Sequence, residues 1–440
     1  MIVAGIVIAV LGKRTARTCH QKGSVARPEP RLRTAGACVA LLTLWAVGAD
    51  LVEAAAIQIP ASPTSLTSTT KRMISYRNQN HSWQTSDGAI HLMVNTGSAG
   101  GALTLYSSFD NGVTYVPEFT LPNTDGTSTS DGILGNAIAN SNLLQLVYGT
   151  QTSSGEILYV AALYNAATQS WALGTPQLIY GAKGQYASAP AVNVDSTGSL
   201  WCSYTVEVVS SEMYNLQMSY QSAGTSTWVR SGLAFGGSDT SGQHAGRPVP
   251  LANGIGMVYQ DGASMYWAYR LSSWPDTTPW VSTLLYTGLP PAGSDPYDSH
   301  FNVAADANGN LFLIFAGSSG ALEYLMYSNA TGAWGPLQAL GAASYDVTYM
   351  QVVIAGGNVI FIVNDKTSLV VFQSNNDGAS FTLTQALLHT VGTGLDYNNP
   401  RVEAPTYCTS PIPTWQQFFS STTQYLMFFA VPVLPLTGSK

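Results

Sequence analysis

Short apolar runs alternate with turns along almost the whole chain. A typical run is about eight residues long and rich in Val, Ile, Leu, Tyr and Phe, as in "GALTLYSS" and "SLVVFQSN", and Gly, Asp, Asn and Ser fill the turns between runs. Runs of this length and composition, closed by such turns, are typical of β-strands rather than helices. The pattern therefore predicts an all-β protein.

One series of runs ends in an aromatic residue that follows a turn. The series recurs about every 50 residues, which is the period of a β-repeat rather than of a helical one. Its aromatic members are Tyr115, Trp171, Trp228, Trp280, Trp334 and Phe381. We interpret these aromatic residues as packing residues of a repeated unit, because they recur in register.

A second series, in phase with the first, consists of a short strand, a turn and a very apolar strand. Its seven members start at His81, Asp131, Ser188, His244, Ser299, Asp346 and Asn399. Four strands in a repeat of about 50 residues predict a seven-bladed β-propeller of four-stranded antiparallel blades. Residues 57–76 are expected to supply the missing strand of the last blade. Six blades, or an array of β-sandwiches, are the alternatives.

Composition and charge narrow the classes of function. The 440 residues are 45% hydrophobic and only 9% charged, with a net charge of −7. Seven of the 17 Lys and Arg residues lie in the first 56 positions, so the rest of the chain is clearly acidic. No basic stripe is left, which argues against a nucleic-acid partner.

The N-terminal region has the pattern of an export signal. The segment "RLRTAGACVALLTLWAVGADLVEAAA" joins a basic flank to an apolar stretch and then to Ala54–Ala56, a small-residue cleavage site. We expect residues 1–56 to be the export segment and 57–440 to be one propeller domain, secreted or periplasmic, with no membrane attachment after cleavage. A retained signal anchor is the alternative. Cys202 and Cys408 lie in apolar runs and are expected to be buried thiols.

Two turns in the chain share one pattern. "SSFDNGVTY" contains Ser108–Tyr115 and "SNNDGASF" is Ser374–Phe381, and both fit Ser-x-Asp/Asn-x-Gly-x-Thr/Ser-aromatic. They resemble the Asp-box turns of the sialidase-like, or BNR-repeat, β-propellers. The resemblance implies a carbohydrate-active propeller, either a sialidase, another glycosidase, a polysaccharide lyase or a glycan-binding protein. Fold alone does not choose among these activities.

Rare polar residues gather at the predicted starts of the inner strands. Three groups are represented: His81, His244 and His300; Arg77, Arg247 and Arg401; and Tyr297 and Tyr345, with Glu403 two residues after Arg401. Each residue taken alone could simply cap a strand. Their joint position in a charge-poor chain predicts a site for an anionic group such as a carboxylate.

Elimination on a uronate-containing polysaccharide is the first chemistry that fits these residues. It needs a cation for the carboxylate, a base for the C5 proton and an acid for the departing oxygen. The site then resembles the His/Arg/Tyr sites of propeller lyases such as the ulvan lyases. His244, His300, His81 and Tyr345 are the catalytic candidates, and the substrate-binding candidates are Arg247, Arg77, Arg401, Glu403 and Tyr297. Gly246 and Pro248 suggest an irregular strand start that turns both His244 and Arg247 to the channel.

Two other functions remain open. A sialidase-type exo-glycosidase would use Arg77, Arg247 and Arg401 on the carboxylate with Glu403 beside them, but the Arg-Ile-Pro motif of that family is absent. A non-catalytic glycan-binding propeller is the other alternative. We expect a monomer with an acidic oligo- or polysaccharide as partner, no metal in the catalytic site and no cofactor, although Ala304–Asn310 is a candidate loop for a structural Ca²⁺.

Overall fold

A computed structural model provides the structure of the chain. It describes residues 62–70, 73–74, 78–97, 102–122, 124, 132–134, 142–150, 155–239, 244–275, 277–289, 301–317, 321–344, 347–365, 368–388, 396–420 and 423–435. These residues form strands and turns and no helix, as the apolar runs predict. The described residues accordingly include no helix that is long and apolar enough to cross a membrane.

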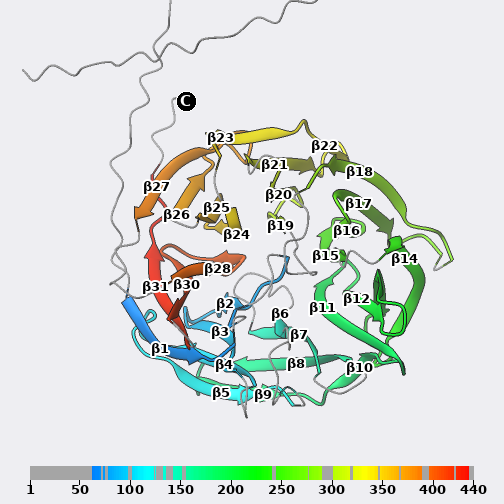
Figure 1. The fold of residues 1–440 in the computed structure, drawn as a ribbon, viewed down its shortest axis with the longest axis horizontal. Coiled ribbons are helices and arrows are strands. Elements are labelled where there is room, and N and C mark those ends of the chain that lie inside the picture. Colours follow the sequence, from blue (N-terminus) through cyan, green and yellow to red (C-terminus); the bar gives the residue numbers. More distant parts are fainter. Residues whose placement is uncertain are drawn as a thin grey trace, which may run out of the picture. The chain divides into compact units, whose positions relative to one another are not determined.

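The strands form seven sheets arranged in a ring (Figure 1). Blade 1 consists of β2 (Ser82–Gln84), β3 (Ile90–Asn95), β4 (Leu103–Ser108) and β5 (Val116–Thr120). Blade 2 consists of β6 (Gly132–Leu134), β7 (Leu143–Gly149), β8 (Ile157–Asn165) and β10 (Gln177–Tyr180), with β9 (Ser170–Leu173) also paired to β8. Blade 3 consists of β11 (Gln185–Val194), β12 (Leu200–Val208), β13 (Met213–Gln221) and β14 (Val229–Asp239).

The next three blades repeat this plan. Blade 4 consists of β15 (His244–Leu251), β16 (Gly254–Asp261), β17 (Ser264–Leu271) and β18 (Val281–Thr287). Blade 5 consists of β19 (Phe301–Ala305), β20 (Leu311–Ala316), β21 (Ala321–Ser328), β22 (Ala333–Trp334) and β23 (Gln338–Ser344). Blade 6 consists of β24 (Val347–Ala355), β25 (Asn358–Asp365), β26 (Ser368–Gln373) and β27 (Thr382–Leu388), with β29 (Tyr407–Cys408) parallel to β24.

The seventh blade closes the ring with strands from both ends of the domain. It consists of β28 (Asp396–Glu403), β30 (Ile412–Ser420), β31 (Thr423–Val431) and β1 (Ser62–Ser68). β1 pairs antiparallel with β31, with Ser62 opposite Phe428 and Ser68 opposite Gln424. Seven blades and the closing N-terminal strand are therefore both confirmed.

The hydrophobic core is divided among the interfaces between neighbouring blades. Each of the seven buried clusters found among the described residues joins strands of two adjacent blades. The recurring aromatic residues Tyr115, Trp171, Trp228, Trp280, Trp334 and Phe381 each pack in the cluster between their own blade and the preceding one. Their period in the sequence is thus the period of blade stacking, as predicted.

The two similar turns also have the same hydrogen bonds. In the first, the hydroxyl of Ser108 accepts the N–H of Gly112 at 2.8 Å, and the carboxylate of Asp110 accepts the N–H and the hydroxyl of Thr114 at 2.8 and 2.7 Å. The second turn repeats the two backbone bonds with Ser374, Gly378, Asn376 and Ser380. Both turns connect the third and fourth strands of a blade, which are the outer strands of that blade.

The two cysteines behave as predicted. Cys202 and Cys408 are free and buried. Burial raises the pKa of Cys408 to about 12 and moves the pKa of Cys202 well above its usual value. Both thiols therefore stay protonated at neutral pH and serve as small apolar core residues.

Candidate functional site

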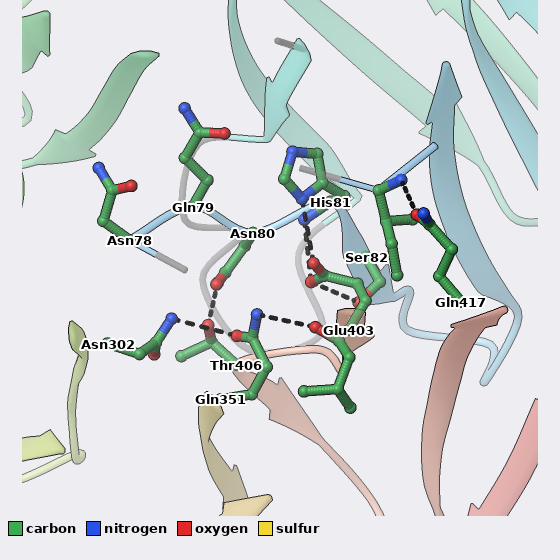
Figure 2. Close-up of polar contacts among 12 residues, drawn as sticks. Asn78, Gln79, Asn80, His81, Ser82, Asn302, Gln351, Glu403, Thr406 and Gln417 are labelled. Atoms are coloured by element: carbon green, nitrogen blue, oxygen red, sulfur yellow. Dashed lines mark hydrogen bonds and ion pairs between the residues drawn. The ribbon is translucent and has the colours of Figure 1, made fainter. Parts of the chain in front are cut away.

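A polar segment, residues 78–81, lies in the middle of the ring just before β2 (Figures 1 and 2). Its side chains are at most 5% exposed. The amide of Asn78 donates to the carbonyl of Gly246 in blade 4 at 3.2 Å, and the amide of Gln79 donates to the carbonyl of Pro190 in blade 3 at 3.1 Å. Asn80 donates to the hydroxyl of Thr406, which follows the inner strand of blade 7. This axial segment therefore connects four blades through polar side chains.

His81 and Glu403 form the centre of the site, as Figure 2 shows. The Nδ1 atom of His81 lies 3.0 Å from Oε2 of Glu403, and the backbone N–H of His81 donates to Oε1 at 3.0 Å. The hydroxyl of Ser82 donates to the same Oε1 atom at 3.2 Å. The carboxylate thus fixes the position of the imidazole through the backbone and the side chain at once.

The second nitrogen of the His81 imidazole makes no hydrogen bond to any described residue. The Nε2 atom of His81 is buried and has no hydrogen-bond partner among the described residues. A buried polar atom without a partner costs stability, so such an atom marks a place where a ligand or a water gains a hydrogen bond. With a carboxylate on Nδ1 and an open Nε2, the imidazole has the arrangement of a general base.

Arg247 lies on the inner strand of blade 4 and reaches the axial segment. Its Nη1 atom donates to Oδ1 of Asn80 at 3.1 Å, and its Nη2 atom donates to the hydroxyl of Thr406 at 3.3 Å. Burial lowers the pKa of Arg247 to about 10, although Tyr407 and Glu403 counteract this decrease. The guanidinium is therefore still charged at neutral pH. It places a cation against Asn80, the residue that precedes His81 in the chain.

Arg401 is a second buried cation, two residues before Glu403 on β28. Residues two apart on a strand project to the same side, so Arg401 and Glu403 share a face. The guanidinium carbon of Arg401 lies 4.7 Å from the centre of the Tyr349 ring, and the side chain is 1% exposed. Its Nε and Nη1 atoms have no hydrogen-bond partner among the described residues. Each of these N–H groups is a donor of the kind that carboxylates accept.

His244 does not join this group. Strand β15 pairs with β16 without any shift of register, from His244 opposite Asp261 to Leu251 opposite Gly254. The irregular start suggested by Gly246 and Pro248 is therefore wrong, and the side chains of His244 and Arg247 project to opposite faces of the strand. The Nδ1 atom of His244 instead lies 3.2 Å from a carboxylate oxygen of Asp261 in its own blade.

Four of the predicted site residues cannot be placed. His300, Tyr345, Arg77 and Tyr297 lie outside the described residues. The structure thus brings together His81, Glu403 and Arg247 around the axial segment. It places the guanidinium of Arg401 over Tyr349 of blade 6 and pairs His244 with Asp261 in its own blade.

The sequence did not point to Asn78, Gln79, Asn80, Ser82 or Thr406. The available signal was the run of three amide residues directly before His81, which resembles an exposed loop. In the structure this run is buried on the axis, where its amides satisfy backbone carbonyls of other blades. A related amide pair, Asn302 and Gln351, links the inner strands of blades 5 and 6 at 3.2 Å.

The loop considered for Ca²⁺ is closed by its own hydrogen bonds. One carboxylate oxygen of Asp306 accepts the N–H groups of Asn308 and Asn310 at 2.9 and 2.8 Å, and the other accepts the amide of Asn310. Across the described residues, no three His, Cys, Asp or Glu side chains come close enough to bind one metal ion. A Ca²⁺ ion in this loop stays a prediction.

Comparisons with known proteins bear on the fold. No protein-family profile matches the chain, and no curated protein sequence matches it. Similar solved structures include Trypanosoma rangeli sialidase in complex with the inhibitor DANA, at 12% identity and a TM-score of 0.47, over 74% of this chain and 59% of the sialidase. They also include a mutant Aleuria aurantia lectin in complex with α-methyl-L-fucoside, at 12% identity and a TM-score of 0.41, over 70% of this chain and 97% of the lectin.

A lyase is also among these structures. Polysaccharide lyase Uly1 is 13% identical, with a TM-score of 0.42, over 85% of this chain and 98% of the lyase. At such identities each likeness concerns the fold alone. The predicted seven-bladed propeller is confirmed by the seven sheets themselves, and we draw no argument from these likenesses, whose TM-scores are below 0.5.

Proposed function

We propose that the protein is a carbohydrate-active propeller that cleaves an acidic, uronate-containing polysaccharide by β-elimination. One observation carries the proposal: Glu403 holds Nδ1 of His81, and Nε2 of the same imidazole has no partner among the described residues. This arrangement supports a base that is oriented by a carboxylate and directed at a proton of the substrate.

The two arginines supply the second requirement of the reaction. A uronate loses its C5 proton readily only when the negative charge that develops on its carboxylate is stabilised. Arg401, on the strand that also carries Glu403, offers two donors without partners among the described residues, and Arg247 is a second buried cation, bonded to Asn80 beside His81. Arg401 is the main candidate for the substrate carboxylate, because the donors of Arg247 already bind Asn80 and Thr406.

The proposed reaction conserves atoms and electrons. His81 Nε2 takes the C5 proton, the C5–H electron pair forms the C4–C5 double bond, and the C4–O4 bond breaks with its pair leaving on O4. An acid then protonates O4 and releases a new sugar end. Tyr345 is the catalytic tyrosine that the sequence predicts and our candidate for this acid, and it lies outside the described residues.

The contacts of Glu403 favour elimination over sialidase hydrolysis. A sialidase-type mechanism would pair this glutamate with a tyrosine that acts as nucleophile. Among the described residues, the Glu403 carboxylate instead bonds to His81 and Ser82. We therefore place the exo-glycosidase after the lyase.

Glycan binding without catalysis is a second candidate, and burial favours it. His81 is 2% exposed and Glu403 is fully buried, so a sugar reaches Nε2 only after surrounding groups move. If they do not move, the cluster acts as a polar link that holds the ring closed. Export to the periplasm or medium, a monomeric state and an acidic glycan as partner are further parts of this proposal.

The test is a panel of acidic and neutral polysaccharides incubated with the folded domain. Elimination yields an unsaturated uronate that absorbs in the ultraviolet, whereas hydrolysis yields reducing ends without that absorbance. The proposal expects both signals on a uronate polysaccharide and neither on a neutral one. Binding without either signal indicates the glycan-binding alternative, and reducing ends alone indicate hydrolysis.

A further inference from the structure

A separate cavity of about 590 Å³ opens where the inner strands of blades 3 to 6 end. Its wall includes Pro250 near the end of β15, Ile354 near the end of β24, and Tyr407 of β29. None of His81, Glu403, Arg247 or Arg401 lines it. The cavity is therefore distinct from the candidate site, although Tyr407, which lines the cavity, interacts electrostatically with Arg247.

The second of the two similar turns forms part of this cavity. Asp377 of the turn Ser374–Phe381 lines the wall. The equivalent residue of the first turn is Asn111, which lines another cavity of about 390 Å³. Asp377 and Asn111 both have a left-handed backbone, with φ of 54° and 57°. Each copy of the turn thus lines a cavity, and the same position of the turn provides the lining residue in both.

Glycine makes this placement possible. A Cβ atom on Gly378 would lie 2.0 Å from the ring of Phe312 in blade 5, and one on Gly112 would lie 2.5 Å from the ring of Phe428 in blade 7. Each turn therefore packs directly against an aromatic ring of the preceding blade. This packing brings the residue before the glycine to the groove between two blades.

The chemistry of the cavity is apolar with acidic groups at its edge. Pro250, Ile354, Val359 and Tyr407 contribute apolar surface. The charged residues among the described lining are Asp195, Asp306 and Asp377, and that described lining includes no Lys, Arg or His. Such a lining repels anions and attracts cations.

The three carboxylates differ in what they bind. Asp195 accepts the indole N–H of Trp201 at 2.8 Å and the N–H groups of its own turn, and Asp306 is bonded within its turn in the same way. Asp377 is exposed, and no hydrogen bond of its carboxylate is found among the described residues. Asp377 is therefore the carboxylate that can pair with a ligand.

We propose that this cavity binds an organic cation with an apolar body, such as an arylalkyl ammonium compound. The apolar walls accommodate the body, the Tyr407 ring adds a cation–π surface, and Asp377 pairs with the charge. The charge of Arg247, which interacts with Tyr407, opposes a cation, and the interaction of Arg247 with Glu403 offsets that charge. The inference does not depend on the proposed glycan chemistry.

The test titrates the full protein with phenethylammonium, its neutral analogue 2-phenylethanol and the anion phenylacetate, and follows binding by calorimetry or ligand-detected NMR. Phenethylammonium is expected to bind about fivefold or more tightly than phenylacetate. Asp377→Asn removes the charge but keeps the turn, because Asn111 occupies the same position with the same backbone. This variant is expected to bind phenethylammonium about threefold more weakly.

A second pair of variants tests the location. Ala307 is an exposed residue of the cavity wall, and Ala307→Trp fills the space, so it is expected to abolish binding of phenethylammonium. Ala223→Trp, on an exposed turn outside the cavity, is the matched control and is expected to bind like the wild type. Equal affinity for cation and anion, absence of binding, or unchanged binding by Ala307→Trp each overturn the proposal.

Discussion

The Nδ1 atom of His81 lies 3.0 Å from the Oε2 atom of Glu403, and this contact joins the first blade of the propeller to the last. The two residues are 322 positions apart in the chain. Only the closed ring brings them together. The contact therefore serves two roles, because it both orients an imidazole and links the blades where the ring closes.

Removal of the Glu403 carboxylate should destabilise the fold. Glu403→Ala leaves the N–H of His81 and the hydroxyl of Ser82 without their acceptor in a buried place, which costs about 3 kcal/mol of unfolding free energy. Urea unfolding measures this loss. Glu118→Ala on the outer strand β5 is the control and should change stability by about 0.5 kcal/mol or less.

A double-mutant cycle separates the pair from its surroundings. His81→Ala and Glu403→Ala in combination should cost about 1–3 kcal/mol less than the two single losses together. Additive losses would show that His81 and Glu403 do not depend on each other and would contradict the contact.

His91 should make the fold sensitive to acid. It is fully buried between aromatic rings, its ring nitrogens contact Ser107 and Thr85, and burial lowers its pKa to about 3, with a small opposite effect of Asp87. The unfolded residue titrates at about 6.5, so between these values the unfolded state binds more protons. The contribution of His91 to the free energy of unfolding is therefore fully present above about pH 6.5. It decreases by up to about 1.4 kcal/mol per pH unit as the pH falls towards 3.

The measurement compares wild type with His91→Gln, a neutral side chain that can still bond to Ser107 or Thr85. Urea unfolding measures the free energy of unfolding at pH 7 and at pH 5. Its decrease between the two pH values should be about 2 kcal/mol smaller in the variant than in the wild type. Equal losses in both proteins would show that His91 is not the acid-sensitive group.

Asp110 should stabilise its turn and contribute nothing to catalysis. The N–H of Thr114, followed by its hydroxyl, lowers the pKa of Asp110, so the stability that this carboxylate adds is present at neutral pH and is lost in acid. Asp110→Ala should lower the unfolding free energy by about 1 kcal/mol, and activity per folded molecule should not change. Asp110→Asn is the matched control, because Asn376 holds this position in the second turn, and it should lose clearly less.

Arg401 should matter for turnover of an acidic glycan. Arg401→Lys keeps the charge but loses the planar donors, and the account expects turnover about 100-fold lower, with the pH profile unchanged. Arg270→Lys is the control: Arg270 is also buried, but its guanidinium binds the carbonyls of Trp274 and Thr278 away from the channel. Equal activity of the two variants would remove Arg401 from the site.

His244 is expected to have little effect, since it projects to the other face of β15 from Arg247. His244→Ala should keep turnover within about threefold of the wild type, once corrected for the folded fraction. A loss as large as that of Arg401→Lys would return His244 to the catalytic group.

Much of the fold could be predicted because its physical causes are local and repeated. The aromatic residue after each outer turn packs at one blade interface, so its period in the sequence reports the number of blades. The pairing of β1 with β31 could also be predicted, because a ring of blades needs its last sheet completed.

The site could be predicted only in part. His, Arg and Glu are rare in this chain, and this singled out His81, Arg247, Arg401 and Glu403 as candidates. No local sequence pattern shows that His81 and Glu403 are in contact, because their contact arises from ring closure. The amides Asn78 and Asn80 resemble loop residues in the sequence because their burial depends on crossing the axis. The expected irregular start of β15 was wrong because Gly246 and Pro248 fit a regular strand here.

The central claim is that Nε2 of His81 removes the C5 proton of a uronate. The most direct measurement is the ultraviolet absorbance that wild type and His81→Gln produce on the same uronate polysaccharide, with folding of both proteins verified by unfolding curves. We predict that the absorbance increases with time for the wild type, and that its rate of increase is at least about 100-fold lower for His81→Gln. No absorbance from the wild type on any uronate polysaccharide, or an equal rate from the folded variant, would contradict it.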